Sequence, residues 1–414
     1  SYHLKHNAPL TSDLDGLAKS SSDWVKRVTS PEQITQCAND AWKAANEAPG
    51  NIATLIVPAD YAWSDIQTDL PKKVELNNRK SVDKKLIEAA YKLLLKPNSM
   101  LYLGGKFLDE ECLKFAAQIA TKTGCRLVTD TFVSRIRRGA GLPIVQQVPY
   151  FSEMAEDFLQ GTESIVFIGT KPPVSFFAYP DKKSFLSPDE AELFELCSVE
   201  ENGYEALALL SELSGSPKIA NDLIRPHISD VPTSGDLDVT TLGPLIADMM
   251  PEESIVSDES ATSSLIVTPH ALQAKPHDWL ALTGGSIGQG LPLAIGASIA
   301  KPDRPVITLH GDGGAMYTVQ ALWTQARENL NITNIIFSNR SYEILKIELD
   351  RVQAVETGER AASMFSMDNP PIDWVNLAES MGVQGYKPKT VKEFKDVFSK
   401  SVNESGPSLI EIEI

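Results

Sequence analysis

The sequence predicts an α/β protein made of doubly wound domains with parallel sheets. Short apolar runs, such as residues 99–103, 164–168 and 332–337, alternate along the chain with longer segments of helical periodicity. Unbroken apolar strands of this kind are typical of parallel sheets, whose two faces are both covered by helices. Turns rich in glycine follow several of the runs, as expected where ligands bind at the carboxyl ends of such strands.

The alternation divides the chain of 414 residues into three segments joined by polar stretches. Residues 1–66 contain an expected helix at 31–48 and an expected strand at 52–57. The central segment, residues 84–215, is expected to form an α/β domain. Its helices are predicted at 84–95, 110–123 and 203–214, and its strands at 99–103, 126–129 and 164–168. Residues 67–83 and 216–236 are predicted linkers, and the second leads into the last domain, residues 237–414.

The composition limits the partners and the compartment. A net charge of −17 disfavours binding to nucleic acid or to an anionic membrane, because both would repel the chain. No apolar stretch approaches the roughly 20 residues of a membrane-spanning helix. The cysteines are scattered without metal-ligand spacing, which predicts neither a zinc site nor a disulfide framework and favours a reducing, cytoplasmic location.

The most informative stretch is residues 303–341. It predicts a strand at 306–309, the turn Gly311-Asp312-Gly313-Gly314, a helix at 316–329 and a second strand at 332–337. Asp312 and Asn339 should then lie at the carboxyl ends of neighbouring strands. The Asp312 carboxylate, the Asn339 amide oxygen and a nearby backbone carbonyl are hard oxygen ligands that suit Mg²⁺, which would complete its shell with water and phosphate. The N–H groups of Gly313 and Gly314 would hold that phosphate.

Gly311-Asp312-Gly313 and Asn339 resemble the cofactor motif of the thiamine diphosphate-dependent enzymes, and Asp312 and Asn339 are 27 positions apart. The resemblance implies that thiamine diphosphate and Mg²⁺ bind here, with Asp312, Asn339 and the backbone oxygen of Ser341 as metal ligands. It also implies that Gly311 and Gly314 line the cofactor. Ser338 stands where the family usually has asparagine, a departure that leaves the ligand set intact.

Two further stretches carry the resemblance. Residues 282–296, which include Gly284-Gly285-Ser286-Ile287-Gly288, are similar to the family segment that bends the cofactor. By that resemblance Ile287 wedges thiamine into its bent shape, and the Gly285 carbonyl accepts a hydrogen bond from the aminopyrimidine group. Residues 255–264 are similar to the diphosphate-binding loop of benzoylformate decarboxylase-like enzymes, which implies that the Ser260 and Thr262 hydroxyls contact the diphosphate. Ala261 stands where threonine is common.

The first segment resembles only the last third of the pyrimidine-binding domain in acetolactate synthase-like enzymes, through residues 6–13, 24–25 and 56–60. The family's activating glutamate lies in the earlier part of that domain, so we expect it to precede Ser1. The parent protein is then expected to be an enzyme, whereas the chain alone is expected to be incompetent. The family also implies a homodimer or homotetramer, because its cofactor lies between subunits.

The resemblance implies decarboxylation of a 2-oxo acid followed by carboligation, as in acetolactate synthases. The alternative is decarboxylation without ligation, as in benzoylformate decarboxylases. A comparable central domain can hold FAD in acetolactate synthases. Gly104-Gly105-Lys106 and Gly169-Thr170-Lys171 follow strands where an anion could bind, but neither has the spacing of a phosphate-binding Walker loop, and nothing in them requires FAD.

Two other classes of function are open from the residues alone. Residues 284–288 fit the GxSxG pattern of a hydrolase with Ser286 as nucleophile, but the only later histidine is His310. Residues 285–290 are similar to a dinucleotide-binding loop, but the acidic residue expected afterwards falls at Asp303, in a predicted turn. We therefore expect neither function.

Overall fold

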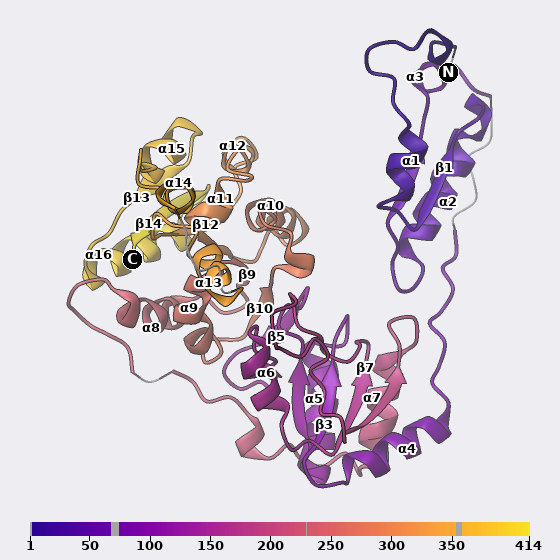
Figure 1. The fold of residues 1–414 in the computed structure, drawn as a ribbon, viewed down its shortest axis with the longest axis vertical. Helices are drawn as coiled ribbons and strands as arrows, with labels where there is room; N and C mark the ends of the chain where they lie inside the picture. The colour runs from indigo at the N-terminus through magenta and orange to yellow at the C-terminus, as the bar shows by residue number, and fades with distance from the viewer. Residues whose placement is uncertain (1, 68–73, 229, 353–357) are drawn as a thin grey trace. The chain divides into compact units, whose positions relative to one another are not determined.

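The computed structural model describes residues 2–67, 74–228, 230–352 and 358–414 (Figure 1). The chain forms two compact units. Unit 1 consists of Ser1–Val82 and Cys197–Gly203, and unit 2 consists of Asp83–Leu196 and Tyr204–Ile414. Positions 68–73 of the first predicted linker and position 229 of the second lie outside the described residues.

Unit 1 contains a two-stranded parallel sheet with short helices. Strand β1 (Trp24–Arg27) pairs with β2 (Ala53–Ile56). The 3-10 turn η2 (Pro31–Gln33) and helix α2 (Ile34–Asn46) connect the two strands, so the helix expected at 31–48 and the strand expected at 52–57 are confirmed. The remaining helices of the unit are η1 (Leu4–His6), α1 (Leu14–Lys19) and α3 (Ala59–Ala62).

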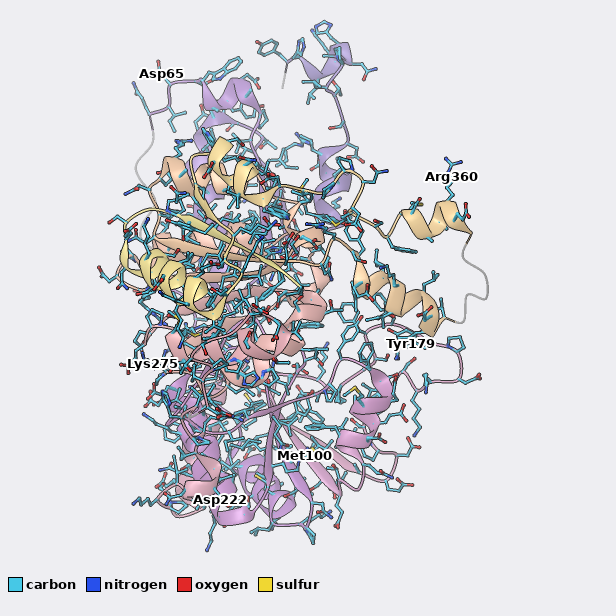
Figure 2. All side chains as sticks on the ribbon, turned by 90° about the vertical axis from the view of Figure 1, so that its left-hand side faces the viewer. Asp65, Met100, Tyr179, Asp222, Lys275 and Arg360 are labelled. Carbon is cyan, nitrogen blue, oxygen red and sulfur yellow. The ribbon has the colours of Figure 1, made fainter. Side chains whose placement is uncertain are left out.

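The central segment forms a five-stranded sheet in the order β6-β4-β3-β7-β8. Its strands are β3 (Ser99–Leu103), β4 (Arg126–Thr129), β6 (Gln146–Gln147), β7 (Ser164–Ile168) and β8 (Glu192–Cys197). Its helices are α4 (Lys84–Leu94), α5 (Glu110–Thr123), α6 (Ser152–Leu159) and α7 (Gly203–Leu213). Every residue of β3 and β7 is buried, including Met100 (Figure 2), which explains the unbroken apolar sequence of these strands. The elements predicted here are confirmed.

A seven-stranded sheet in the order β13-β14-β12-β11-β9-β10-β5 follows. Its strands are β5 (Ile136–Arg138), β9 (Ile255–Glu259), β10 (His277–Leu280), β11 (Val306–Gly311), β12 (Ile332–Ser338), β13 (Gln384–Tyr386) and β14 (Ser408–Glu413). All of its pairs are parallel except β5 with β10. Strand β5 lies within the central segment in the sequence but pairs with the last sheet. The prediction of a separate central domain at 84–215 does not include this shared strand.

The remaining helices and 3-10 turns that the structure describes in unit 2 are η3 (Asn221–Leu223), α8 (Val239–Met249), η4 (Ala261–Ser263), α9 (Ser264–Ala271), η5 (Thr283–Gly285), α10 (Gly290–Ala300), α11 (Asp312–Ala315), α12 (Ala321–Arg327), α13 (Glu343–Arg351), α14 (Glu359–Ser363), α15 (Trp374–Ser380) and α16 (Val391–Asn403). Within the described ranges, no helix combines the length and the apolar character needed to cross a membrane.

One predicted helix is wrong in extent. The segment predicted as a helix at 316–329 forms a turn and then the short helix α12. The turn is held because the Thr318 hydroxyl donates to the Gly288 carbonyl at 2.6 Å. Leu322 is fully buried, whereas the next residue, Trp323, is 54% exposed.

Candidate active site

The ends of strands β11 and β12 bring the two predicted metal-ligand side chains to one edge of the sheet. The strands are parallel neighbours, with Gly311 opposite Phe337, so Asp312 and Asn339 follow adjacent strand ends. The Asp312 carboxylate accepts hydrogen bonds from the amides of Arg340 at 2.7 Å and Gly313 at 2.8 Å. The first of these bonds ties the turn after β11 to the loop after β12.

The donor set suits a hard divalent cation. Asp312 is 3% exposed, and burial raises the pKa of its carboxyl, while the Arg340 and Gly313 amides oppose that shift. The Asn339 side-chain oxygen accepts the Ser341 amide at 3.0 Å, which fixes the turn that carries both residues. Carboxylate and amide oxygens of this geometry keep a second lone pair each. Within the described ranges no group of three or more His, Cys, Asp or Glu side chains could hold a metal, so a cation here needs additional oxygens, as Mg²⁺ does.

The glycines of the 311–314 turn are held closely by their neighbours. A Cβ on Gly313 would lie 2.6 Å from the Tyr342 ring, and one on Gly314 would lie 3.0 Å from the Glu259 carboxylate. We expect from the sequence that the N–H of Gly313 is free to hold a phosphate. In the structure this N–H donates a hydrogen bond to the Asp312 carboxylate, so it is not free. Gly314 is therefore the remaining candidate for a phosphate contact in this turn.

The turn that contains Gly285 and Ile287 depends on glycine. Gly284, Gly285 and Gly288 have φ angles of 63°, 66° and 98°, in the left-handed region that favours glycine. The Ile287 amide donates to the Gly285 carbonyl at 2.9 Å, which leaves one lone pair on that oxygen. The Ile287 side chain is 46% exposed. The turn thus presents an apolar side chain and a carbonyl on a constrained backbone.

The two hydroxyls that were expected to contact the diphosphate, those of Ser260 and Thr262, have different surroundings in the loop after β9. Ser260 is 1% exposed, and its hydroxyl donates to Asp258 at 2.5 Å, so its single proton is not available to a diphosphate. Thr262 is partly buried. Ala261 between them has a φ of 48°, which costs free energy for a residue with a Cβ and is typical of functional loops. Thr262 is the better candidate of the two.

A buried acid–histidine pair that sequence analysis missed connects all three motifs. Glu259 and His310 are opposite each other in the β9–β11 register, and the Glu259 carboxylate lies 3.3 Å from His310 Nε2. The same carboxylate accepts the amides of Gly288 at 2.5 Å and Gly290 at 2.6 Å. Burial raises the pKa of Glu259, but His310 and the two amides outweigh it, and the net shift is downward. Glu259 is therefore held as a carboxylate between β9, β11 and the glycine turn.

Comparisons with known proteins identify the relatives of the chain. A family profile described as thiamine pyrophosphate enzyme, C-terminal TPP binding domain, matches residues 261–412. A Mycobacterium tuberculosis protein, provisionally named acetolactate synthase large subunit IlvX, is 38% identical over 99% of this chain and 79% of its own length. The chain belongs to the thiamine diphosphate-dependent enzymes.

Solved structures show the same fold. The thiamine diphosphate-dependent 4-hydroxybenzoylformate decarboxylase of Rhodococcus jostii RHA1 superposes with a TM-score of 0.81 at 23% identity, over 100% of this chain and 80% of that one. The benzoylformate decarboxylase of Polynucleobacter necessarius superposes with a TM-score of 0.82 at 21% identity, with the same coverage. The predicted α/β fold with parallel sheets is confirmed.

The positions of the residues that would serve a hydrolase or a dinucleotide-binding protein agree with membership among the thiamine diphosphate-dependent enzymes. Ser286 is exposed, whereas His310 is fully buried against Glu259, so the GxSxG pattern is not part of a hydrolase triad. Asp303 lies in a turn before β11 and not at a strand end, as expected if the glycines do not bind a dinucleotide.

Helix α13 docks on the central segment. Glu348 accepts the hydroxyls of Tyr150 at 3.0 Å and Tyr179 at 2.6 Å, and Figure 2 shows Tyr179 beside this helix. Arg351 donates to both oxygens of Glu153 at 2.6 and 2.8 Å and lies over the Tyr179 ring. The hydrogen bond from Arg351 lowers the pKa of Glu153 to about 2. The segment that follows Ser341 is thus tied to the central segment through α6 and two loop tyrosines.

A cavity of about 300 Å³ lies beside the carboxyl ends of β4 and β7 and reaches Gly284. Asp130 accepts the hydroxyls of Tyr102 at 2.9 Å and Thr170 at 2.7 Å inside it. Burial raises the pKa of Asp130, and these two hydrogen bonds oppose the shift. The aromatic side chains of its wall are Tyr102, Phe132, Tyr150 and Phe176.

Close packing explains the glycines at 104 and 169, in the two turns where an anion could bind. A Cβ on Gly104 would lie 2.5 Å from the Thr170 side chain, and one on Gly169 would lie 2.5 Å from the Phe107 ring. These glycines are therefore needed to bring two strand ends together, whether or not a ligand binds there.

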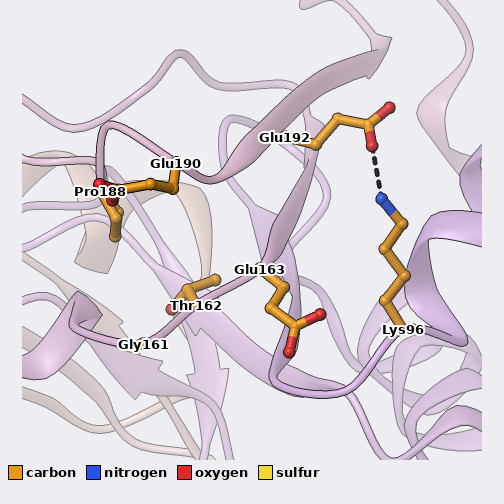
Figure 3. Close-up of a pocket in the computed structure, with 7 residues that line it drawn as sticks. All are labelled: Lys96, Gly161, Thr162, Glu163, Pro188, Glu190 and Glu192. Atoms are coloured by element: carbon orange, nitrogen blue, oxygen red, sulfur yellow. Dashed lines mark hydrogen bonds and ion pairs between the residues drawn. The ribbon is translucent and has the colours of Figure 1, made fainter.

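A wider cavity of about 550 Å³ lies at the other end of β7 (Figure 3). Acidic side chains dominate its lining, and the Lys96 ammonium lies 2.6 Å from Glu192. Thr162 and Glu163 precede the first residue of β7, so the cavity is at the amino end of that strand. Ligands of open α/β sheets bind at the opposite, carboxyl end.

Proposed function

We propose that this chain takes part in thiamine diphosphate- and Mg²⁺-dependent decarboxylation of a 2-oxo acid, followed by carboligation of the product, as acetolactate synthase does. The observation that carries the proposal is the all-oxygen site of Asp312 and Asn339 at adjacent strand ends, linked through the Arg340 amide. Thiamine diphosphate, when bound, supplies a nucleophilic carbon and an electron sink for the charge left by departing carbon dioxide.

The chain's own residues have distinct roles in this proposal. Asp312, Asn339 and the Ser341 carbonyl would hold Mg²⁺, which would offset the negative charge of the diphosphate. Thr262 and the Gly314 amide would contact the diphosphate. The exposed Ile287 side chain would pack against thiamine, and the remaining lone pair of the Gly285 carbonyl would accept a hydrogen bond from its amino group. The rigid glycine turn keeps these two groups in place.

Decarboxylation without ligation is the second candidate. The cavity next to Gly284 is lined by Phe132, Tyr150 and Phe176, which suits an aromatic 2-oxo acid. Product analysis after incubation with pyruvate or with benzoylformate separates the two candidates. Acetolactate from pyruvate supports the first, and benzaldehyde from benzoylformate supports the second.

Cofactor binding is measured separately from turnover. The activating glutamate of the family has no counterpart that we can assign in these residues, so a third candidate is a chain that binds cofactor without catalysing the reaction. Titration calorimetry with thiamine diphosphate and Mg²⁺ tests binding. Heat of binding without either product would identify this third case, and absence of Mg²⁺-dependent binding would contradict the proposal as a whole.

Three further properties belong to the proposal. We expect a homodimer or homotetramer, which sedimentation at micromolar concentration tests. We place the protein in the cytoplasm, in keeping with the free and buried state of Cys37, Cys112, Cys125 and Cys197. FAD is a minor candidate for the central segment, since a cavity of about 300 Å³ is at the lower limit for organic ligands. Flavin absorbance of the purified protein decides it.

A further inference from the structure

A small cavity lined by arginines lies where strand β5 joins the seven-stranded sheet. Its volume is about 10 Å³, and Arg137, Arg138 and Arg225 all line it. The rest of the lining consists of a glutamine, a proline, a glycine and aliphatic residues, so no described acidic side chain contributes to the wall. The arginines therefore meet no carboxylate in the wall of the cavity itself.

Arg138 has both of its terminal nitrogens unused. Its side chain is buried, and its guanidinium lies flat on the Trp279 ring, with Cζ 3.5 Å from the ring centroid. Its Nε donates to His277 Nε2 at 3.4 Å across the β5–β10 pair. Neither Nη1 nor Nη2 has a hydrogen-bond partner among the residues that the structure describes. A buried charged donor without a partner is costly, so a missing acceptor is expected.

His277 cannot supply that acceptor. Burial lowers the pKa of His277 to about 3, and the charge of Arg138 adds to this shift, so the ring is neutral. Its Nδ1 is 2.8 Å from the carbonyl of Lys275, which is labelled in Figure 2, and therefore carries the proton. The lone pair on Nε2 is then already used by Arg138 Nε.

The nearby carboxylates do not balance the three arginines. Arg137 is paired with Glu253 and, at 3.6 Å, with Glu110. Arg225 forms no ion pair with any carboxylate in the described ranges. Asp258 is the carboxylate whose charge acts on Arg138, but its Oδ1 already accepts both the amide and the hydroxyl of Ser260. The cavity therefore keeps an excess of positive charge.

We propose that this cavity binds a small monovalent inorganic anion, chloride in particular, between the Nη groups of Arg138 and Arg225. A volume of about 10 Å³ holds one particle of roughly the size of water, so phosphate, carboxylates and organic ligands do not fit. The anion would supply the acceptor that Nη1 and Nη2 of Arg138 lack. Because Arg138 lies on β5, the bound anion stabilises the junction between the central segment and the last sheet.

Thermal unfolding of the full chain in different sodium salts tests the site without cofactor. The melting temperature in sodium chloride is compared with that in sodium gluconate at equal ionic strength, since gluconate is too large to enter. Binding to the folded state alone raises the melting temperature, and above the dissociation constant the rise follows the logarithm of the chloride concentration. Bromide should act as chloride does, and crystals grown in bromide should show an anomalous scatterer within hydrogen-bond distance of the Arg138 Nη groups.

Arginine variants assign the effect to the cavity. Arg138→Met keeps an apolar stem on Trp279 and should lose the chloride response. Arg225→Gln, at a partly buried position outside the strands, should also lose it, and this variant remains informative where Arg138→Met does not fold. Arg360→Gln changes an exposed arginine on α14 and should keep the full response. Equal melting temperatures of the unaltered protein in chloride and gluconate, or crystals without an anomalous scatterer at Arg138, would overturn the proposal.

Discussion

Replacing Glu259 with glutamine tests whether one carboxylate holds the cofactor motifs together. The Glu259 carboxylate accepts two backbone amides, from Gly288 and Gly290, and contacts His310. Glutamine has nearly the same shape but a single acceptor oxygen, and its NH₂ group would face the other amide. One buried N–H then loses its partner, which costs about 1–3 kcal/mol, and the remaining bond loses its charge, which costs about 1 kcal/mol more.

The sum predicts that Glu259→Gln lowers the free energy of unfolding by about 2–4 kcal/mol. For a compact unit of more than 300 residues, the melting temperature should fall by roughly 3–6 °C. Circular dichroism during heating measures the fall, and Glu190→Gln, at an exposed position in the acidic cavity, is the matched control and should change stability by less than about 0.5 kcal/mol. A melting temperature for Glu259→Gln equal to that of the control would refute the reasoning. Cofactor titration of the folded variant then shows whether the glycine turn has also moved.

Three other predictions follow from contacts described above. Asp312→Asn keeps the acceptors for Arg340 and Gly313 partly in place but removes the charge. The Mg²⁺-dependent affinity for thiamine diphosphate should therefore fall more than about tenfold, or about 1.4 kcal/mol. Calorimetry showing unchanged affinity would rule out the metal assignment. Gly313→Ala should destabilise the protein, because the added Cβ would collide with the Tyr342 ring. Gly296→Ala, in α10 with open space around it, should stabilise the protein by about 0.5–1 kcal/mol. Thermal melts in which the two variants behave alike would contradict this pair of predictions. The pKa of Glu153 is lowered by its pairing with Arg351, so this pair contributes stability that is complete above the unfolded pKa near 4.5 and is lost as the pH falls through about 2. Hydrogen exchange of α13 should therefore stay slow at pH 4 in the unaltered protein and be faster in Arg351→Met. Equal exchange in both proteins would count against the docking contact.

The sequence predicted those parts of the site that depend on local chain order. Asp312 and Asn339 could be placed together because consecutive parallel strands usually lie next to each other and end at the same edge. Glu259 and His310 could not be paired, because their contact depends on β9 being the other neighbour of β11, and strand order is not encoded in periodicity. The clue that was available is a pair of carboxylates, Asp258 and Glu259, at the carboxyl end of a strand that begins with apolar residues.

Local chemistry explains the remaining differences. The helical pattern at 316–329 is genuine at Ala321–Arg327, but a tertiary hydrogen bond from Thr318 outweighs it in the first turn. Similarly, Ser260 and Thr262 have the same hydroxyl chemistry in the sequence. Only the fold shows that Asp258 uses the proton of one of them.

Strand β5 affects how the protein can be divided for experiments. It is the last strand of the seven-stranded order, so it covers the edge of β10, and its Arg138 covers the face of Trp279. A fragment cut within residues 216–236 would keep β10 but lose that covering strand, and would present unpaired backbone groups beside an apolar indole. Such a fragment should associate with other chains through this edge. The cofactor-binding half is therefore not an independent module for expression or domain exchange unless the segment around residues 136–138 accompanies it.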